Sequence, residues 1–268
     1  MTAHIRRQRF DLYAAGRRLH AERLTPPQAS GPTLVFLHEG LGSIGQWGAF
    51  PAQLCAQTHL PGLVYERWGY GRSEALAGPR SSDYLHREAE DSLPEVLAAC
   101  GVVGPPILFG HSDGGSIALL FAAAYPEQVG AVISEAAHVL VEEICLAGIR
   151  RAGEAYEQGE LRAGLQRHHR DNVDPMFRGW HEVWLRPSRR SWNIEAELRR
   201  IRCPTLIIQG QDDEYGTRAQ VDAIAAGVSG PVEIQWLPGC GHTPHHQLRE
   251  TVLGAAASFL DRVCATID

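Results

Sequence analysis

The stretch PPILFGHSDGGSIALLFAAAYP, residues 105–126, decides the fold. A short apolar run, typical of a buried strand, leads through a tight turn at Ser112 into a long helix rich in Ala and Leu. Such a turn needs small residues on both sides, and Gly110 and Gly114 complete the pattern Gly-x-Ser-x-Gly. The pattern predicts a serine hydroxyl exposed at the end of a strand. A glycine-rich turn with an unreactive serine is the alternative.

A serine hydroxyl is a weak nucleophile at neutral pH and needs a base, which in turn needs an acid to orient it. Candidates for both follow downstream. Asp212 and Asp213 come directly after the strand-like run at 203–210, and His242 follows the next such run at 232–237. Because the carboxyl ends of parallel strands meet at one edge of a sheet, these side chains can converge. The chain order Ser, Asp, His is expected of one particular fold.

Four apolar runs, including the one that precedes Ser112, predict a parallel sheet. They lie at residues 33–38, 62–66, 106–110 and 130–134. The segments between them have helical periodicity, which is typical of strands joined by helices and buried on both faces. Two extended stretches around Gly16, within residues 7–24, predict an antiparallel hairpin, and an amphipathic helix is expected at 245–267.

From residue 138 to residue 200 the strands are interrupted by helix-like stretches rich in Arg, Glu, His and Trp. We therefore expect one α/β core, formed by residues 1–137 and 201–268, and a helical cap formed by residues 138–200.

Three bulky residues of the predicted cap share one face of a helix. Phe177, Trp180 and Trp184 are spaced three and four apart. Together with Leu41 they are candidates for the wall of a hydrophobic substrate pocket. Packing of cap helices against each other or against the sheet is the alternative for the same face.

Five motifs spread over nearly the whole chain resemble those of the α/β-hydrolase superfamily. They are HEG at 38–40, ERWGYGRS at 66–73, GHSDGG at 110–115, GQDDEYG at 210–216 and GCGHTPHH at 239–246. The resemblance implies a serine hydrolase with a mostly parallel central sheet, helices on both faces and an inserted helical cap. It also implies that Ser112 is the nucleophile, His242 the general base and Asp213 the orienting acid. Asp212 and Glu135 are the alternatives for the acid.

The loop LVFLHEGLGSIGQW, residues 34–47, also matches a second pattern. Gly40, Gly42 and Gly45 have the spacing of a dinucleotide-binding turn, and Glu66 stands where a ribose-binding acid belongs. However, two residues separate the strand from the first glycine, a proline interrupts the helix that should bind phosphate, and a serine turn follows in place of a second nucleotide-binding half. We therefore predict no dinucleotide and no other cofactor.

The resemblance gives this loop another role, as part of an oxyanion hole that stabilises negative charge on a former carbonyl oxygen. The implied donors are the N–H groups of Gly40 and Asp113, with Leu41 as the fallback for the first. Glu39 replaces the glycine usual in the family, and its carboxylate would oppose an oxyanion if it pointed inward. We expect Glu39 to point away or to be paired; positioning of substrate or water is the alternative.

The composition narrows the partners. A net charge of −6 and a pI near 6.1 argue against nucleic acid or an anionic membrane, so a small-molecule substrate is expected, with a homodimer as an open alternative. Residues 1–18 contain neither a signal peptide nor a membrane span, which favours a cytoplasmic location. The cysteines lack Cys-x-x-Cys pairs, which predicts reduced thiols.

Several polar residues are expected to have no part in the chemistry. His245 and His246 have no thiolate or carboxylate at zinc spacing, so no metal is predicted. His168, His169 and the arginine pair at 189–190 are expected to lie on solvated surface of the cap.

These patterns together predict a hydrolase that cleaves a carboxylic ester, lactone or thioester of a small hydrophobic substrate through an acyl-enzyme at Ser112. A carbon–carbon bond hydrolase acting on ring-cleavage products would use the same three side chains and is the first alternative. A non-catalytic ligand-binding relative is the second.

Overall fold

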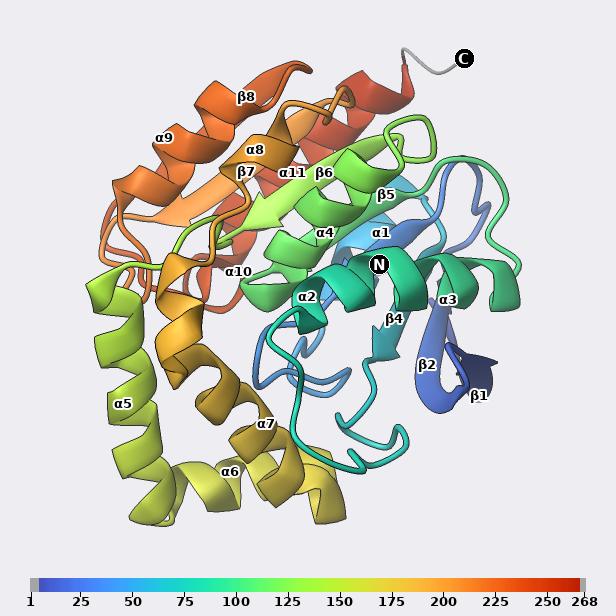
Figure 1. The fold of residues 1–268 in the computed structure, drawn as a ribbon. Coiled ribbons are helices and arrows are strands. Elements are labelled where there is room, and N and C mark those ends of the chain that lie inside the picture. Colours follow the sequence, from blue (N-terminus) through green and yellow to red (C-terminus); the bar gives the residue numbers. More distant parts are fainter. Residues whose placement is uncertain (1–4, 266–268) are drawn as a thin grey trace.

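The computed structural model describes residues 5–265, which form one eight-stranded sheet covered by helices (Figure 1). The strands are β1 (Arg6–Ala14), β2 (Arg17–Thr25), β3 (Leu34–Leu37), β4 (Gly62–Glu66), β5 (Ile107–His111), β6 (Ala131–Glu135), β7 (Thr205–Gly210) and β8 (Val232–Leu237). Their order across the sheet is β1-β2-β4-β3-β5-β6-β7-β8. Residues 1–4 and 266–268, which include both ends of the predicted core and the end of the predicted closing helix, lie outside the described residues.

The directions of the strands confirm the predicted fold class. β1 and β2 form the expected antiparallel hairpin, and β2 also pairs antiparallel with β4. The remaining neighbours in the sheet, from β4 to β8, are all parallel. Strands β3 to β7 are buried along their whole length, which explains their continuous apolar sequences.

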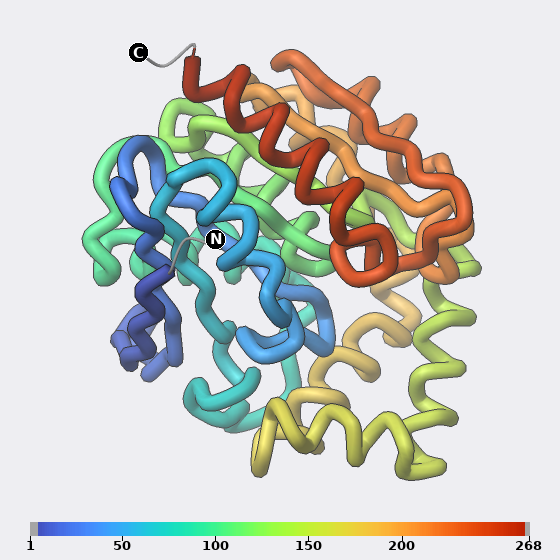
Figure 2. The backbone as a smooth tube through the Cα atoms, turned by 180° about the vertical axis from the view of Figure 1, so that it is seen from behind, coloured from blue at the N-terminus to red at the C-terminus, as the bar shows by residue number. Residues whose placement is uncertain are grey.

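Helices lie on both faces of the sheet. α1 (Phe50–Thr58) and α11 (Arg249–Cys264) cover one face, which Figure 2 shows from the front. The opposite face is covered by α2 (Tyr84–Arg87), the π-helical turn η1 (Glu88–Ser92), α3 (Leu93–Ala99), α4 (Asp113–Ala124) and α9 (Arg218–Gly227). Buried apolar side chains accordingly form two clusters, one on each face.

Between β6 and β7 the chain leaves the sheet as a series of helices. These are α5 (Glu143–Glu157), α6 (Glu160–His169), the 3-10 turns η2 (Arg170–Asn172) and η3 (Pro187–Ser191), α7 (Val173–Leu185) and α8 (Glu195–Leu198). α5, α6 and α7 pack on one another beside the edge where the parallel strands end, and a bridge between Leu140 and Asn193 closes their base (Figure 1). α8 packs instead against α4 and α9, next to the sheet.

The prediction of one continuous closing helix at 245–267 is wrong. The structure has two helices, α10 (Pro244–Gln247) and α11, and the backbone of Leu248 between them leaves the helical region (φ −128°, ψ 49°). The break is explained by a contact with a distant strand. His245 is tied to Glu135 at the end of β6 through its backbone N–H and its ring, so α10 stays at the sheet edge while α11 turns back along the face.

The turn between β5 and α4 has the geometry that its glycines predict. Ser112 adopts φ 53° and ψ −116°, a strained conformation for a residue with a side chain. A methyl group at Gly114 would overlap the carbonyl oxygen of Leu37 in β3, and one at Gly110 would overlap the carbonyl group of Gly114. At these two glycines, helix α4 therefore approaches β3 and β5 closely enough for backbone atoms to be in contact.

We expect Gly114→Ala to lower the free energy of unfolding by about 3 kcal/mol or more, because the overlapping oxygen belongs to a buried strand that cannot yield. Thermal unfolding followed by circular dichroism measures the loss. Gly254→Ala in α11 is the matched control, since no atom of the described residues lies within 4 Å of an added methyl group there. This control should stabilise the protein by about 0.5–1 kcal/mol. Equal stability of the Gly114 variant and the wild type would contradict the described packing.

Candidate active site

Three side chains from separate strand ends meet in one hydrogen-bonded row. Nε2 of His242 lies 2.9 Å from Oγ of Ser112, and Nδ1 of His242 lies 2.9 Å from each carboxylate oxygen of Asp213. Ser112 follows β5, Asp213 follows β7 and His242 follows β8. All three side chains are buried. A carboxylate only accepts hydrogen bonds, so Nδ1 carries the proton and Nε2 accepts the serine hydroxyl.

Asp213 is held by donors besides His242. Its carboxylate accepts the backbone N–H groups of Tyr215 (2.8 Å) and Gly216 (3.2 Å) and the side-chain amide of Gln209 (2.6 Å). Burial by itself raises the pKa of this carboxyl, but the interaction with His242 and the backbone hydrogen bonds outweigh it and lower the pKa to about 2. Asp213 is therefore ionised at neutral pH.

His242 is a stronger base than an ordinary histidine. Burial lowers the pKa of its ring, but the charge and the hydrogen bond of Asp213 act in the opposite direction and are reinforced by the charges of Glu39 and Glu214. The net effect raises the pKa. Such a ring is suited to accept a proton from the serine hydroxyl.

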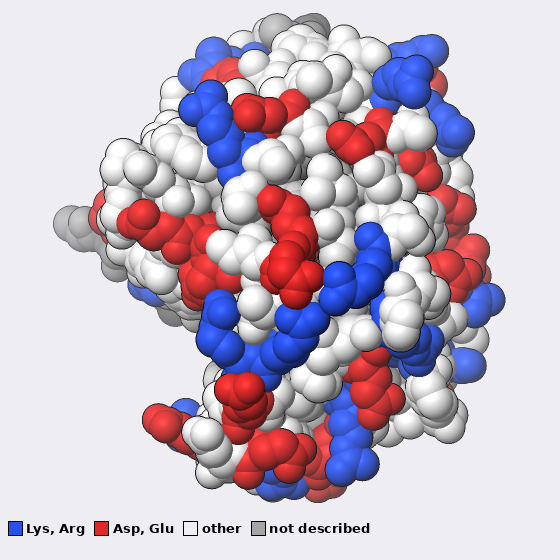
Figure 3. All heavy atoms as spheres, turned by 60° about the vertical axis from the view of Figure 1, so that its left-hand side comes forward, with Lys and Arg blue, Asp and Glu red and all other residues white. Residues whose placement is uncertain are grey.

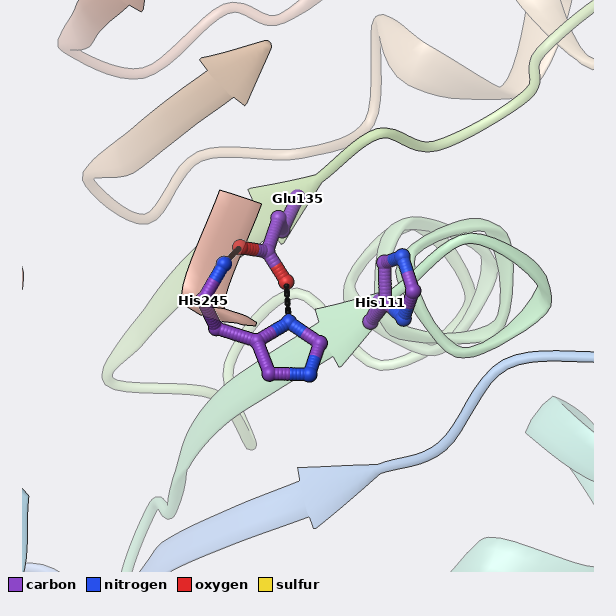
Figure 4. Close-up of side chains that lie close together, drawn as sticks. All are labelled: His111, Glu135 and His245. Carbon is purple, nitrogen blue, oxygen red and sulfur yellow. Dashed lines mark hydrogen bonds and ion pairs between the residues drawn. The ribbon is translucent and has the colours of Figure 1, made fainter. Parts of the chain in front are cut away.

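Neither alternative acid is hydrogen-bonded to His242. Asp212 is exposed, and Glu135 is fully buried with its two oxygens bound to His245, one to the backbone N–H (2.8 Å) and one to Nδ1 (2.6 Å). Figure 4 shows this pair beside the ring of His111. His111 donates its Nε2–H to the backbone carbonyl of His242 (2.7 Å). A second acid–imidazole pair thus lies close to the first and is linked to it through His111.

His111, Glu135 and His245 are also the one group among residues 5–265 with atoms close enough to share a metal ion, within 4.8 Å of one another. A metal would have to displace the hydrogen bond between Glu135 and His245. Burial raises the pKa of Glu135 and lowers the pKa of both imidazoles, which favours uncharged rings. The hydrogen bonds of this cluster hold the segment from His242 to His245 against the sheet.

The loop after β3, residues 38–42, lies at the same cavity as Ser112. Gly40 and Asp113 both line this cavity, and neither N–H has a partner within the described residues. The carboxylate of Asp113 accepts the hydroxyl of Tyr84 (2.6 Å) and lies 3.6 Å from the guanidinium of Arg67, so its charge is balanced away from the serine.

Glu39 was expected either to point away from the cavity or to be paired, and the first of these is not observed. It lines the wall, and its Oε2 lies 3.8 Å from Nδ1 of His111. Burial lowers the pKa of His111 to about 3, so at neutral pH this ring carries no charge that would balance the carboxylate. Glu39 therefore contributes negative charge to the cavity.

The cavity beside Ser112 has a volume of about 210 Å³. Its wall combines the 38–42 loop, the serine turn, the cap and the loops after β7 and β8: Glu39, Gly40, Leu41, Ser112, Asp113, His138, Cys145, Ile149, Trp180, Trp184, Glu214, Tyr215, His242 and Thr243. A larger cavity of about 350 Å³ lies between the β1–β2 hairpin and α2, and contains none of the three hydrogen-bonded side chains.

Of the expected pocket residues, Leu41, Trp180 and Trp184 line the cavity, but Phe177 does not. Phe177 stacks on Tyr156 of α5 inside the cap, with 3.7 Å between the ring centres. The apolar face of α7 is thus divided along its length, because its first part packs against α5 and its last part reaches the cavity.

Two residues expected at the surface are buried. His169 donates from Nε2 to the carbonyl of Leu41 (2.9 Å) and accepts the N–H of Gly71 at Nδ1 (2.9 Å), so it ties the cap to two loops of the core. Arg189 lies over the rings of Trp184 (4.4 Å) and Trp192 (4.1 Å). Trp184 and Trp192, close to Arg189 in the sequence, could have indicated that this arginine packs against aromatic rings. No local pattern indicates that His169 is buried.

The chain belongs to the α/β-hydrolase family, whose model matches residues 34–255. The human serine hydrolase BPHL is 26% identical over 207 residues, covering 74% of this chain and 68% of that protein. A 2-hydroxy-6-oxo-6-phenylhexa-2,4-dienoate hydrolase of Comamonas testosteroni is 21% identical over 256 residues, covering 86% of this chain and 88% of that protein. The solved enol-lactonase from Burkholderia xenovorans LB400 has a TM-score of 0.74 at 17% identity, covering 94% of this chain and 100% of that one.

In the part of the chain from residue 5 to residue 265, no helix has the length and apolarity needed to cross a membrane. Acidic and basic side chains are intermixed on the face that carries α5 (Figure 3). Arg150 and Arg190, for example, both bind Glu143.

Asp213→Asn should lower the pKa of His242. In the wild type the ring is expected to titrate above the ordinary histidine value of 6.5, because the carboxylate outweighs burial. Without that charge, burial dominates and the titration should move below this value. NMR of the imidazole C–H signals against pH measures both, with a His242→Gln spectrum to assign the resonance. Asp212→Asn is the matched control, and an equal shift in that variant would contradict the choice of Asp213.

Proposed function

We propose that this protein is a serine hydrolase that cleaves a carboxylic ester, lactone or thioester of a small substrate through an acyl-enzyme. The observation that carries the proposal is the 2.9 Å hydrogen bond between Nε2 of His242 and Oγ of Ser112, with Asp213 on the other side of the ring. No cofactor is needed for this chemistry, because an activated serine supplies the nucleophile.

In the proposed reaction, His242 takes the proton of Ser112 while Oγ attacks the carbonyl carbon. The carbonyl oxygen becomes an oxyanion, which accepts the N–H groups of Gly40 and Asp113. Collapse of this intermediate breaks the bond to the leaving group, which departs with the proton from His242. Water then attacks the acyl-enzyme by the same route in reverse, with His242 again as base, and releases the acid.

The cap, residues 138–200, is proposed to close the site over a small substrate. Trp180 and Trp184 give the wall apolar surface, and a cavity of about 210 Å³ suits a short acyl group. The acids Glu39 and Glu214 also line it, and no Arg or Lys is among the described residues of the lining. This charge favours an uncharged substrate over an anionic one.

The same observation weighs against the first alternative, carbon–carbon bond cleavage. The Comamonas relative is named for a dienoate, a substrate with a carboxylate, and the lining of this cavity offers no cation to bind one. Incubation with a vinylogous 1,5-diketone acid and with simple esters, followed by product analysis, separates the two reactions. Cleavage of the diketone in preference to the esters would favour the alternative. A non-catalytic ligand-binding relative would turn over neither.

Ser112→Ala should reduce hydrolysis of short p-nitrophenyl esters by about 10⁴-fold or more, because the acyl-enzyme can no longer form. Release of p-nitrophenol measures the rate, and circular dichroism checks the fold. Ser134→Ala is the matched control: this serine is also buried, and its Oγ has no hydrogen-bond partner among residues 5–265, so its removal should leave the rate unchanged. Undiminished turnover in the Ser112 variant would refute the proposal.

The acidic wall predicts a charge preference. p-Nitrophenyl butyrate and the mono-p-nitrophenyl ester of succinic acid have acyl groups of similar length, and only the second carries a carboxylate. We expect kcat/KM to favour the butyrate by about tenfold or more, since repulsion acts at short range in a partly desolvated cavity. Glu39→Gln should narrow the ratio, whereas Glu127→Gln, on the exposed surface, should leave it unchanged. A ratio that Glu39→Gln does not alter would contradict this role.

A further inference from the structure

Arg67 is a fully buried cation that the proposed reaction does not use. It directly follows β4, its side chain has no exposed surface, and burial of a charge is costly unless partners compensate for it. NH2 of Arg67 donates to the backbone carbonyls of Glu39 (2.6 Å) and His38 (3.2 Å). NH1 lies 3.6 Å from the carboxylate of Asp113. The guanidinium thus contacts both chain segments that carry the proposed oxyanion donors.

The hydrogen bond from Arg67 to the Glu39 carbonyl sets the direction of the Gly40 N–H group. The carbonyl oxygen of Glu39 is held by Arg67, by Nδ1–H of His38 (2.8 Å) and by the N–H of Gly42 (3.2 Å). The peptide bond to Gly40 is trans, as are all those described, so its N–H points opposite to this carbonyl. Three donors on one side therefore turn the N–H of Gly40 away from Arg67. This orientation supports Gly40 as the first donor; Leu41, the fallback, lines the same cavity.

The contact between Arg67 and the carboxylate of Asp113 affects the other proposed donor, the N–H group of Asp113. Asp113 is the first residue of α4, and its side chain is fixed between the hydroxyl of Tyr84 (2.6 Å) and Arg67. Holding this carboxylate also keeps its negative charge away from the position that an oxyanion would take. The N–H of Asp113 stays free at the cavity.

We infer that Arg67 is the positioning residue of the oxyanion hole: it orients the Glu39–Gly40 peptide, anchors Asp113, and places a positive charge behind both donors. The inference rests on the proposed function. A charged donor to the Glu39 carbonyl also polarises the peptide, which strengthens the hydrogen bond that its N–H gives on the far side. The effect should be greatest when the substrate oxygen becomes negative, and so should appear in the transition state.

The test compares Arg67→Met and Arg67→Lys with the wild type, using p-nitrophenyl butyrate. We expect Arg67→Met to lower kcat by about 10- to 100-fold with KM changed by less than about threefold, because transition-state binding is lost without ground-state binding. Inhibition by an alkyl boronic acid, which forms a tetrahedral anion on the serine, should weaken by a similar factor. Inhibition by a neutral alcohol of the same chain length should not.

Arg80→Met is the matched control. Arg80 is also buried and donates to the carbonyl of Trp68 (2.8 Å), but it has no hydrogen bond to the 38–42 loop or to Asp113. The Arg80→Met variant should be less stable than the wild type, but its inhibition by the boronic acid should not weaken more than its inhibition by the alcohol. If Arg67→Met does not fold, Arg67→Lys carries the test, since it keeps the charge but loses the paired donors and should show a smaller loss of the same kind.

Two failures can be told apart. If the wild type shows no turnover that depends on Ser112, the proposed function itself fails. If such turnover exists but folded Arg67 variants keep wild-type kcat and boronate affinity, only the role of Arg67 is overturned. An equal rise in the inhibition constants of the boronic acid and the alcohol would also overturn the role of Arg67, since it would indicate general damage to the site.

Discussion

The close approach of α4 to β5 and β3 is the constraint on which the site depends. Gly110 and Gly114 let the backbones touch, and the chain can make so short a reversal only with a positive φ at Ser112. That conformation brings the serine hydroxyl to the cavity and leaves the N–H of Asp113 free at the start of the helix. The strain is held by the sheet, since the N–H of Ser112 is bound to the carbonyl of Glu135 (2.8 Å).

Around this turn, buried polar groups are arranged in pairs. Asp213 orients His242, and Glu135 orients His245 three residues further along the same segment. His111 lies between the two pairs: it binds the carbonyl of His242, and its ring centre lies 4.9 Å from that of His245. On the other side of the serine, Arg67 connects the 38–42 loop with the start of α4. Buried hydrogen-bonded groups rigidify the region around them, so each reacting group is held by partners outside the cavity.

The sequence predicted the parts of this arrangement that depend on local pattern. The serine turn, the hairpin and the parallel strands follow from spacing within short stretches, and the chain order of Ser112, Asp213 and His242 follows from strand ends meeting at one edge. The residues that were missed act over long separations. His169 meets Leu41 across 128 positions, and Glu135 binds His245 across 110, so neither contact leaves a local signal. The break at Leu248 was missed for the same reason, because the contact that causes it comes from β6.

Covalent labelling can show whether Ser112 is a nucleophile activated by its neighbours. The protein would be treated with a fluorophosphonate, digested, and its peptides mapped by mass spectrometry. We expect one phosphonylated site, at Ser112, and much slower labelling when His242 is replaced by Gln. A protein that stays unmodified, or one labelled at another serine, would contradict it.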